Sequence, residues 1–124
     1  MDKKPKIISG TVVSKGWGRE IHIANNDDYC GKLLVFEKGK KFSMHYHVDK
    51  YETWYVQEGS FKFYWIDPET ADTHLEILGK GDVVTIHQGI AHQLRALEDS
   101  TIFEVSTPDR VEDSYRVLKG DLSL

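Results

Sequence analysis

The sequence has almost no helical periodicity, and this feature constrains its fold more than any other. No long segment repeats apolar residues at spacings of three and four, as an amphipathic helix would. Short runs rich in β-branched and aromatic residues occur instead, and clusters of Asn, Asp, Gly and Pro separate them. The predicted strands are residues 7–13, 19–24, 32–37, 41–47, 52–58, 60–66, 74–78, 82–87, 91–97, 101–106 and 115–118. One helical turn is predicted within residues 108–113.

This close spacing of short strands predicts an all-β chain. Many short strands joined by tight turns are typical of an antiparallel sandwich or barrel. The chain has 124 residues, which is the usual size of one domain. We therefore expect residues 1–124 to form a single domain.

Charge and composition exclude several classes of function. The net charge is −4, whereas proteins that coat nucleic acid or anionic membrane need a basic face. The longest apolar run, residues 33–36, is far too short for a membrane helix, and the first residues lack the apolar stretch of a signal peptide. Cys30 is the single cysteine and cannot form an internal disulfide. We expect a cytoplasmic protein that binds neither nucleic acid nor membrane.

Four residues form a candidate metal site. His45 and His47 are two positions apart in a predicted strand, so their side chains point to the same face. Glu52 would open the next strand beside them, and His92 follows a glycine-containing turn. Imidazole and carboxylate donors suit Zn, Mn, Fe, Ni or Cu. On spacing alone, satisfied core or surface histidines without a metal remain an equal alternative.

The arrangement around the two histidines resembles the first motif of the cupin superfamily. It consists of Gly39, five residues, His45, one residue, His47, four residues, Glu52, six residues and Gly59. Every spacing agrees with the cupin pattern.

A second, more degenerate motif follows. It consists of Gly81, five residues, His87, one residue, Gly89, two residues, His92, three residues and Ala96. The two glycines and His92 match the cupin pattern, whereas His87 replaces a proline and Ala96 replaces an asparagine. The two motifs together imply a double-stranded β-helix, which is a small β-barrel. The resemblance also implies a divalent metal ion (Zn, Mn, Fe, Co or Ni) held by His45, His47, Glu52 and His92.

Shorter segments resemble the cupin domain of type II phosphomannose isomerases. They are Lys-Gly-Trp-Gly at 15–18, Tyr-Cys-Gly-Lys at 29–32, Glu-Thr-Trp at 52–54, Phe-Glu-Val at 103–105 and Glu-Asp-Ser-Tyr-Arg at 112–116. Gly16 and Ser114 depart from the pattern of that group. This resemblance implies interconversion of an aldose and a ketose, with a phosphorylated hexose such as mannose 6-phosphate as the substrate.

Such a reaction needs a base and a phosphate site. We expect His87 or Glu104 to move the proton between the two carbons. Lys32 and Arg95 are the candidate phosphate-binding cations, because both lie in predicted core strands. A metal-dependent dioxygenase and a non-catalytic sugar-binding or regulatory module are the alternatives, since the cupin fold serves many functions.

The N-terminal segment suggests self-association. Residues 6–13 form an apolar-rich strand that precedes both motifs, and an unpaired strand edge is a liability that pairing removes. Because most oligomers are two-fold dimers, we expect a homodimer.

Overall fold

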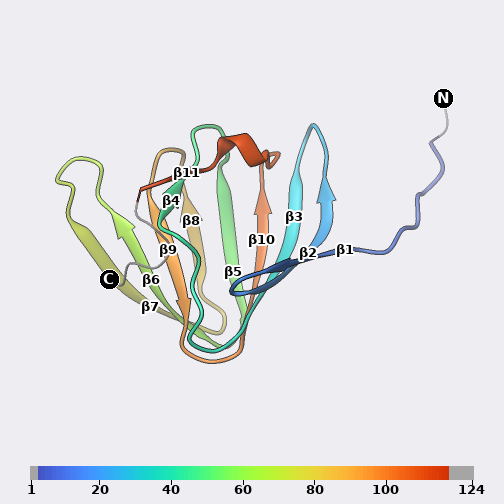
Figure 1. The fold of residues 1–124 in the computed structure, drawn as a ribbon. Helices are drawn as coiled ribbons and strands as arrows, with labels where there is room; N and C mark the ends of the chain where they lie inside the picture. The colour runs from blue at the N-terminus through green and yellow to red at the C-terminus, as the bar shows by residue number, and fades with distance from the viewer. Residues whose placement is uncertain (1–2, 118–124) are drawn as a thin grey trace.

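Two antiparallel sheets face each other and form a small barrel (Figure 1). The computed structural model describes residues 3–117. The larger sheet has the order β1 (Thr11–Lys15), β2 (Gly18–Asn25), β3 (Cys30–Phe36), β10 (Ser100–Ser106), β5 (Glu52–Glu58) and β8 (Val83–Ile86). The smaller sheet has the order β11 (Tyr115–Arg116), β4 (His45–Tyr46), β9 (His92–Ala96), β6 (Ser60–Ile66) and β7 (Thr73–Gly79). A single 3-10 turn, η1 (Val111–Asp113), lies within the predicted helical turn. The predicted all-β barrel is confirmed.

The strands that meet in the larger sheet come from distant parts of the sequence. β10 lies between β3 and β5, with Ile102 opposite Leu34 on one side and opposite Val56 on the other. Side chains alternate along these strands, so that every second residue of β3 is buried. The inward residues include Leu34, Phe36, Val56 and Ile102, which belong to one hydrophobic core. The larger sheet therefore supplies one wall of the barrel interior.

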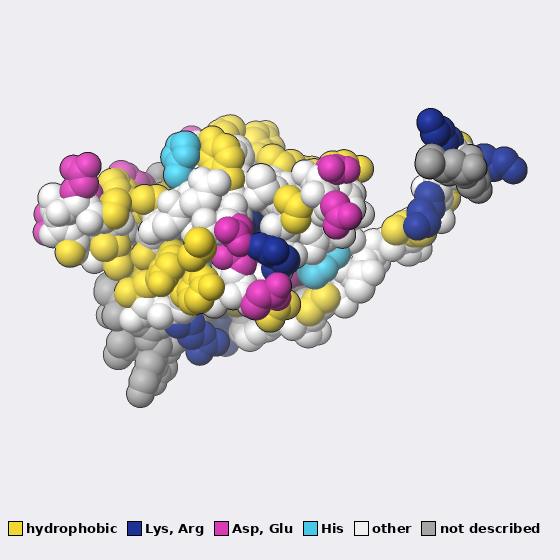
Figure 2. All heavy atoms as spheres, turned by 90° about the horizontal axis from the view of Figure 1, so that it is seen from above, with side chains coloured by type: hydrophobic (Ala, Val, Ile, Leu, Met, Phe, Trp, Pro, Cys, Tyr) yellow, Lys and Arg dark blue, Asp and Glu magenta, His cyan; other side chains and the backbone are white. Residues whose placement is uncertain are grey.

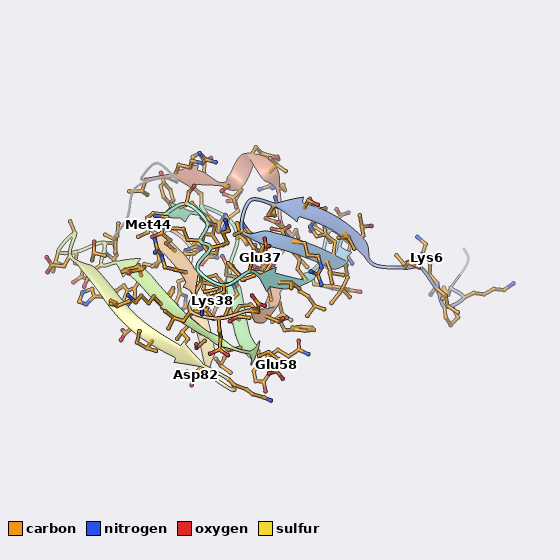
Figure 3. All side chains as sticks on the ribbon, turned by 60° about the horizontal axis from the view of Figure 1, so that its bottom comes forward. Lys6, Glu37, Lys38, Met44, Glu58 and Asp82 are labelled. Atoms are coloured by element: carbon orange, nitrogen blue, oxygen red, sulfur yellow. The ribbon has the colours of Figure 1, made fainter. Side chains whose placement is uncertain are left out.

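Two predicted strands are shorter than expected. Of residues 41–47, only His45–Tyr46 is a strand, and the carbonyl of Phe42 accepts a hydrogen bond from the Gln93 side chain at 2.8 Å. At Phe42 the side-chain amide of Gln93 therefore replaces the backbone N–H group that a neighbouring strand would supply. The predicted strand at 7–13 begins only at Thr11. Residues 3–10 form no strand and leave the barrel as an extended arm, on which Lys6 is labelled (Figure 3).

The C-terminal strand is also short. β11 covers Tyr115–Arg116 of the predicted 115–118, and residue 118 lies outside the described residues.

Gly59 permits the tight turn between β5 and β6. Its φ is +85°, a conformation that side chains disfavour. A Cβ atom at this position would lie 2.0 Å from the Oγ atom of Ser100. The glycine that ends the first motif is thus required both by backbone conformation and by the close approach of β10.

Candidate metal centre

Three histidines converge at one end of the barrel interior. His45 on β4 lies opposite His92 on the neighbouring β9. His47 follows β4, and its ring centroid is 4.9 Å from that of His45 and 5.6 Å from that of His92. One ring nitrogen from each histidine lies within 4.8 Å of the other two. This spacing suits three ligands of a single ion.

Each imidazole is oriented by a backbone carbonyl. The Nδ1 atoms of His45, His47 and His92 lie 2.7, 2.7 and 2.8 Å from the carbonyl oxygens of Ser43, Asp113 and Ile90, in that order. Because a carbonyl oxygen only accepts, each Nδ1 must carry the proton and donate. Each Nε2 then keeps a lone pair, as a metal ligand requires.

Glu52 completes the group and leaves two buried polar atoms facing each other. Its Oε2 atom lies 3.4 Å from Nε2 of His47 and 3.7 Å from Nε2 of His92. Among the described residues, neither this Oε2 nor Nε2 of His92 has a hydrogen-bond partner. Buried polar atoms without partners are costly, and once Glu52 is ionised the two atoms are acceptors that cannot satisfy each other. A cation between them would satisfy both, so these residues fit a divalent metal.

Burial sets the protonation of these ligands. It lowers the pKa of His45 to about 4 and holds the pKa of His92 well below its ordinary value. Burial, with the neighbouring carboxylate of Glu104, raises the pKa of Glu52 to about 8. At neutral pH the imidazoles are therefore neutral and ready to bind a metal, which would displace the proton from Glu52.

A buried lysine lies beside the ligands. The Nζ atom of Lys50 is 2.8 Å from Oε2 of Glu104 and 3.8 Å from Oε1 of Glu52. The Nε1 atom of Trp54 donates to Oε1 of Glu52 at 2.8 Å and to Oε1 of Glu104 at 3.3 Å. Burial alone would raise the pKa of Glu104, but Lys50 and Lys32 outweigh burial and lower it. Glu104 is therefore held as a carboxylate next to the candidate ligands.

Asp113 fixes the loop that joins the ligands. Its carboxylate accepts hydrogen bonds from the backbone N–H groups of Val48, Asp49 and Lys50, at 2.8 Å from Val48 and 3.0 Å from Lys50. Its carbonyl accepts the bond from His47, so one residue of η1 orients both a ligand and the loop leading to Glu52.

Comparison with known proteins identifies the family. A family model described as "Cupin domain" matches residues 32–106, which is more than half of the chain. The chain belongs to the cupin family. Cupins commonly bind a divalent metal, and the three histidines could hold one whose identity is unknown.

One curated relative is a "Probable oxalate decarboxylase" of Arthroderma benhamiae. It is 33% identical over 110 residues, which cover 82% of this chain but 26% of that protein. This cupin chain thus spans about a quarter of the length of that relative.

Solved structures agree on the fold. KdgF from Halomonas sp. has a TM-score of 0.65 at 22% identity, covering 76% of this chain and 81% of its own. Oxalate decarboxylase from Bacillus subtilis has a TM-score of 0.74 at 16% identity, covering 91% of this chain and 33% of its own. Capsular polysaccharide assembling protein CapF from Staphylococcus aureus has a TM-score of 0.74 at 16% identity, covering 89% and 33%. At these identities the likeness shows the fold alone. These relatives give no support to the finer resemblance to phosphomannose isomerases.

The candidate ligands of this cupin line a cavity of about 740 Å³. Glu104 and Lys32, both predicted from the sequence, also line it and are buried. Lys32 forms an ion pair with Asp109 and lies 3.5 Å from Glu20, so its charge is already balanced. Charged side chains of both signs are visible near the middle of the face seen in Figure 2.

The structure does not bring His87 and Arg95 to this cavity. His87 lies on an exposed turn and stacks on Tyr51, with ring centroids 4.9 Å apart. Arg95 alternates on β9 with the inward-facing His92 and Leu94, so it points to the outer face. Neither position supports the role expected from the sequence.

Sequence reasoning missed Lys50 and Asp113. A lysine in a polar turn looks exposed, and only the approach of β10 carrying Glu104 makes Lys50 a buried partner. Asp113 lies within the segment 112–116 quoted for the resemblance, but its contact with His47 spans 66 positions and has no local signal.

Among the described residues, no helix is long and apolar enough to cross a membrane.

Proposed function

We propose that this cupin is a metal-dependent isomerase that interconverts an aldose and a ketose, with a sugar phosphate such as mannose 6-phosphate as substrate. One observation carries the proposal: a single cavity contains the converging ligand atoms and, beside them, the buried pair formed by Glu104 and Lys50. Proton transfer between adjacent carbons needs both a site that polarises substrate oxygens and a group that carries a proton.

A divalent ion held by His45, His47, Glu52 and His92 would supply a Lewis acid for the substrate's carbonyl and neighbouring hydroxyl oxygens. Glu104 is the proposed base, because it is an ionised carboxylate that lines the cavity. It takes the proton from one carbon and returns it to the next. Lys50, 2.8 Å from Glu104, holds this carboxylate in place and balances its charge.

Decarboxylation of a small carboxylic acid is the second candidate. It is favoured by the 33% identity to the probable oxalate decarboxylase, which extends over 82% of this chain. With oxalate, this reaction would break the carbon–carbon bond, release carbon dioxide and add a proton to give formate. Formate from oxalate, with no turnover of sugar phosphates, would establish this candidate instead.

The proposal is tested by metal analysis of the purified protein and by assay after loading with Zn, Co or Mn. We expect mannose 6-phosphate to give fructose 6-phosphate, and deuterium from D₂O to appear at C1 of the product because the proton taken from C2 exchanges on Glu104. Glu104→Gln should lower kcat by about 100-fold or more while metal is retained, since general base catalysis contributes roughly 10²–10⁴-fold. Glu98→Gln, at an exposed acid outside the cavity, is the matched control.

Two outcomes would contradict the isomerase, and a third would contradict only the proposed base. No turnover with any of the metals, on a folded and loaded sample, would leave a sugar-binding or regulatory module. Oxygen uptake with iron would indicate a dioxygenase. Turnover with full activity of Glu104→Gln would remove Glu104 from the mechanism.

The outer face of the larger sheet supports the predicted homodimer, which we include in this proposal. The outward side chains of β3, β10, β5 and β8 carry no charge, and several are exposed apolar groups. Phe103 pairs with Tyr55, and Tyr55 pairs with Val83 on the next strand. An exposed apolar patch without charges can pack against the same patch of a second copy related by a two-fold axis.

Light scattering at micromolar concentration tests the dimer. We expect twice the chain mass of 14.3 kDa, and a monomer for Phe103→Lys. Ile77→Lys, on the outer face of the smaller sheet, is the control and should remain dimeric. A single wild-type species of 14.3 kDa would contradict the proposal.

We also propose a cytoplasmic location. Cys30 is buried and unpaired, and burial raises the pKa of its thiol, so the protein needs no oxidising compartment. Fractionation of the native cell is the direct test.

A further inference from the structure

The basic side chains of the cavity differ in whether a carboxylate balances them. Those that line it are Lys15, Lys32, Lys41, Lys50, Arg110 and Arg116. A carboxylate oxygen lies within 4.0 Å of the charged group of four of them: Lys15, Lys32, Lys50 and Arg110. Lys41 also has an interaction partner. Among residues 3–117, no carboxylate comes as close to Arg116. Within residues 3–117, the guanidinium group of Arg116 is thus the cavity cation with no carboxylate within 4.0 Å, and we take it as the one available to an incoming anion.

The backbone of Arg116 is fixed although its side chain is exposed. β11 pairs with β4, so that Arg116 lies opposite His45 and Tyr115 lies opposite Tyr46. Val117 extends this pairing, because its N–H donates to the carbonyl of Met44 at 3.0 Å. The arginine is therefore presented by a sheet rather than by a free loop.

Strand alternation sets the direction of the side chain. Tyr115 stacks on Tyr46, with ring centroids 5.3 Å apart, on one face of the two strands. Arg116 must then lie on the opposite face, which is the face of the candidate ligand His45. This agrees with its place in the cavity wall.

We infer that Arg116 binds the anionic group, carboxylate or phosphate, of a substrate whose oxygens meet the candidate metal ligands, and so selects anionic over neutral substrates. This inference rests on the proposed function for the idea that a substrate occupies the cavity. A guanidinium group offers paired N–H donors that match two oxygens of a carboxylate or phosphate. Lys32 and Lys50 are poor candidates for this role, because both are buried and already paired with acids.

Kinetics of the metal-loaded protein provide the first test. Arg116→Gln should raise the KM for mannose 6-phosphate about tenfold or more with kcat nearly unchanged, because the contact acts on binding rather than on the reacting carbons. Its KM for neutral mannose should stay at the wild-type value, and Arg116→Lys should fall between. Arg19→Gln is the control and should behave as wild type. Arg19 is exposed and does not line the cavity, although its neighbour Glu20 does.

Calorimetric titration separates this inference from the proposed function. Oxalate, glucuronate, mannose 6-phosphate and mannose are each added to the metal-loaded wild type and to Arg116→Gln. A loss of affinity confined to the anions supports the role of Arg116 even if no sugar is turned over. Loss for the phosphate alone identifies a phosphate ester, and loss for oxalate or glucuronate identifies a carboxylate.

Two results would overturn the inference. One is equal affinity of wild type and Arg116→Gln for every anion. The other is an equal loss for anions and for mannose, since that would reflect a change in cavity shape. Metal content, measured on the same samples, must match the wild type, because a loss of metal alone could mimic either result.

Discussion

The two ends of the barrel interior are built from the same strands but have opposite chemistry. A charged or imidazole side chain at one end is followed, two residues along the same strand, by a buried apolar side chain. The pairs are Lys32 and Leu34 on β3, Glu104 and Ile102 on β10, and His92 and Leu94 on β9. A step of two residues is only about 7 Å. Strand alternation thus lets the inner face of each sheet serve both a polar site and a dry core.

Trp54 lies at the boundary between these ends. Its ring belongs to the hydrophobic core and lies 5.7 Å from the ring of Phe63. Its Nε1 atom donates to Glu52, on the polar side. We therefore expect the stability of the fold to depend mainly on the apolar end. At the polar end, Oε2 of Glu52 and Nε2 of His92 lack hydrogen-bond partners among the described residues, and a metal would satisfy both.

The largest expected effect is at the polar end. His92→Ala should lower metal affinity by more than about 100-fold, because losing a ligand costs more than losing the support of one. The variant should remain folded in the presence of a chelator. Elemental analysis after dialysis measures the metal, with the exposed His74→Ala as the control. Full metal content in His92→Ala would remove this residue from the site.

The apolar end should respond in the opposite way. Ile102→Ala should lower the free energy of unfolding by about 2–4 kcal/mol, because it leaves a cavity in a fully buried position. Metal content per folded molecule should not change. Denaturant unfolding with a chelator measures the loss, and Ile102→Val should lose only about 1 kcal/mol. A loss of metal without a loss of stability would break the division between the two ends.

Asp113→Asn tests the support of the polar end. It keeps the carbonyl that orients His47 but weakens the side-chain hydrogen bonds to the 48–50 backbone, and we expect metal affinity to fall about 10–100-fold as the loop between His47 and Glu52 loosens. Calorimetric titration with Zn measures this. The exposed neighbour Glu112→Gln should bind Zn as the wild type does. Equal affinities for both variants would mean that the loop holds its shape without Asp113.

The smallest effect is the pH dependence of the metal-free protein. Burial lowers the pKa of His45 from 6.5 to about 4, so the unfolded chain binds a proton in this window that the folded protein does not. Stability from this group is complete above pH 6.5 and is lost as pH falls toward 4. Between pH 6.5 and 5 we expect a loss on the order of 1–2 kcal/mol. Thermal unfolding with a chelator should show a flatter profile for His45→Gln than for wild type or His74→Gln.

Much of the architecture could be predicted because strand alternation is a local property of the sequence. The all-β barrel is confirmed, and the spacing of His45, His47 and Glu52 does bring them to His92. That these residues bind a metal stays a prediction. The short β4 could not be foreseen, because the side chain that replaces its backbone pairing, Gln93, comes from a distant strand.

The remaining differences also have a non-local cause. His87 ends a predicted strand, and the candidate ligands also lie in predicted strands, but His87 lies on a turn outside the cavity wall. Lys50 looks like a solvent-exposed turn residue until β10 places Glu104 against it. Contacts between segments far apart in the chain decide both cases, and no pattern within either segment records them.

The bond between His47 and the carbonyl of Asp113 gives the site an order of assembly. All four candidate ligands leave the ribosome before Asp113 does, since synthesis proceeds from the N-terminus. A nascent chain therefore contains all four candidate ligands before it contains Asp113, whose carbonyl orients His47. The orientation of His47 is therefore complete only after η1 has packed against the loop at 48–50.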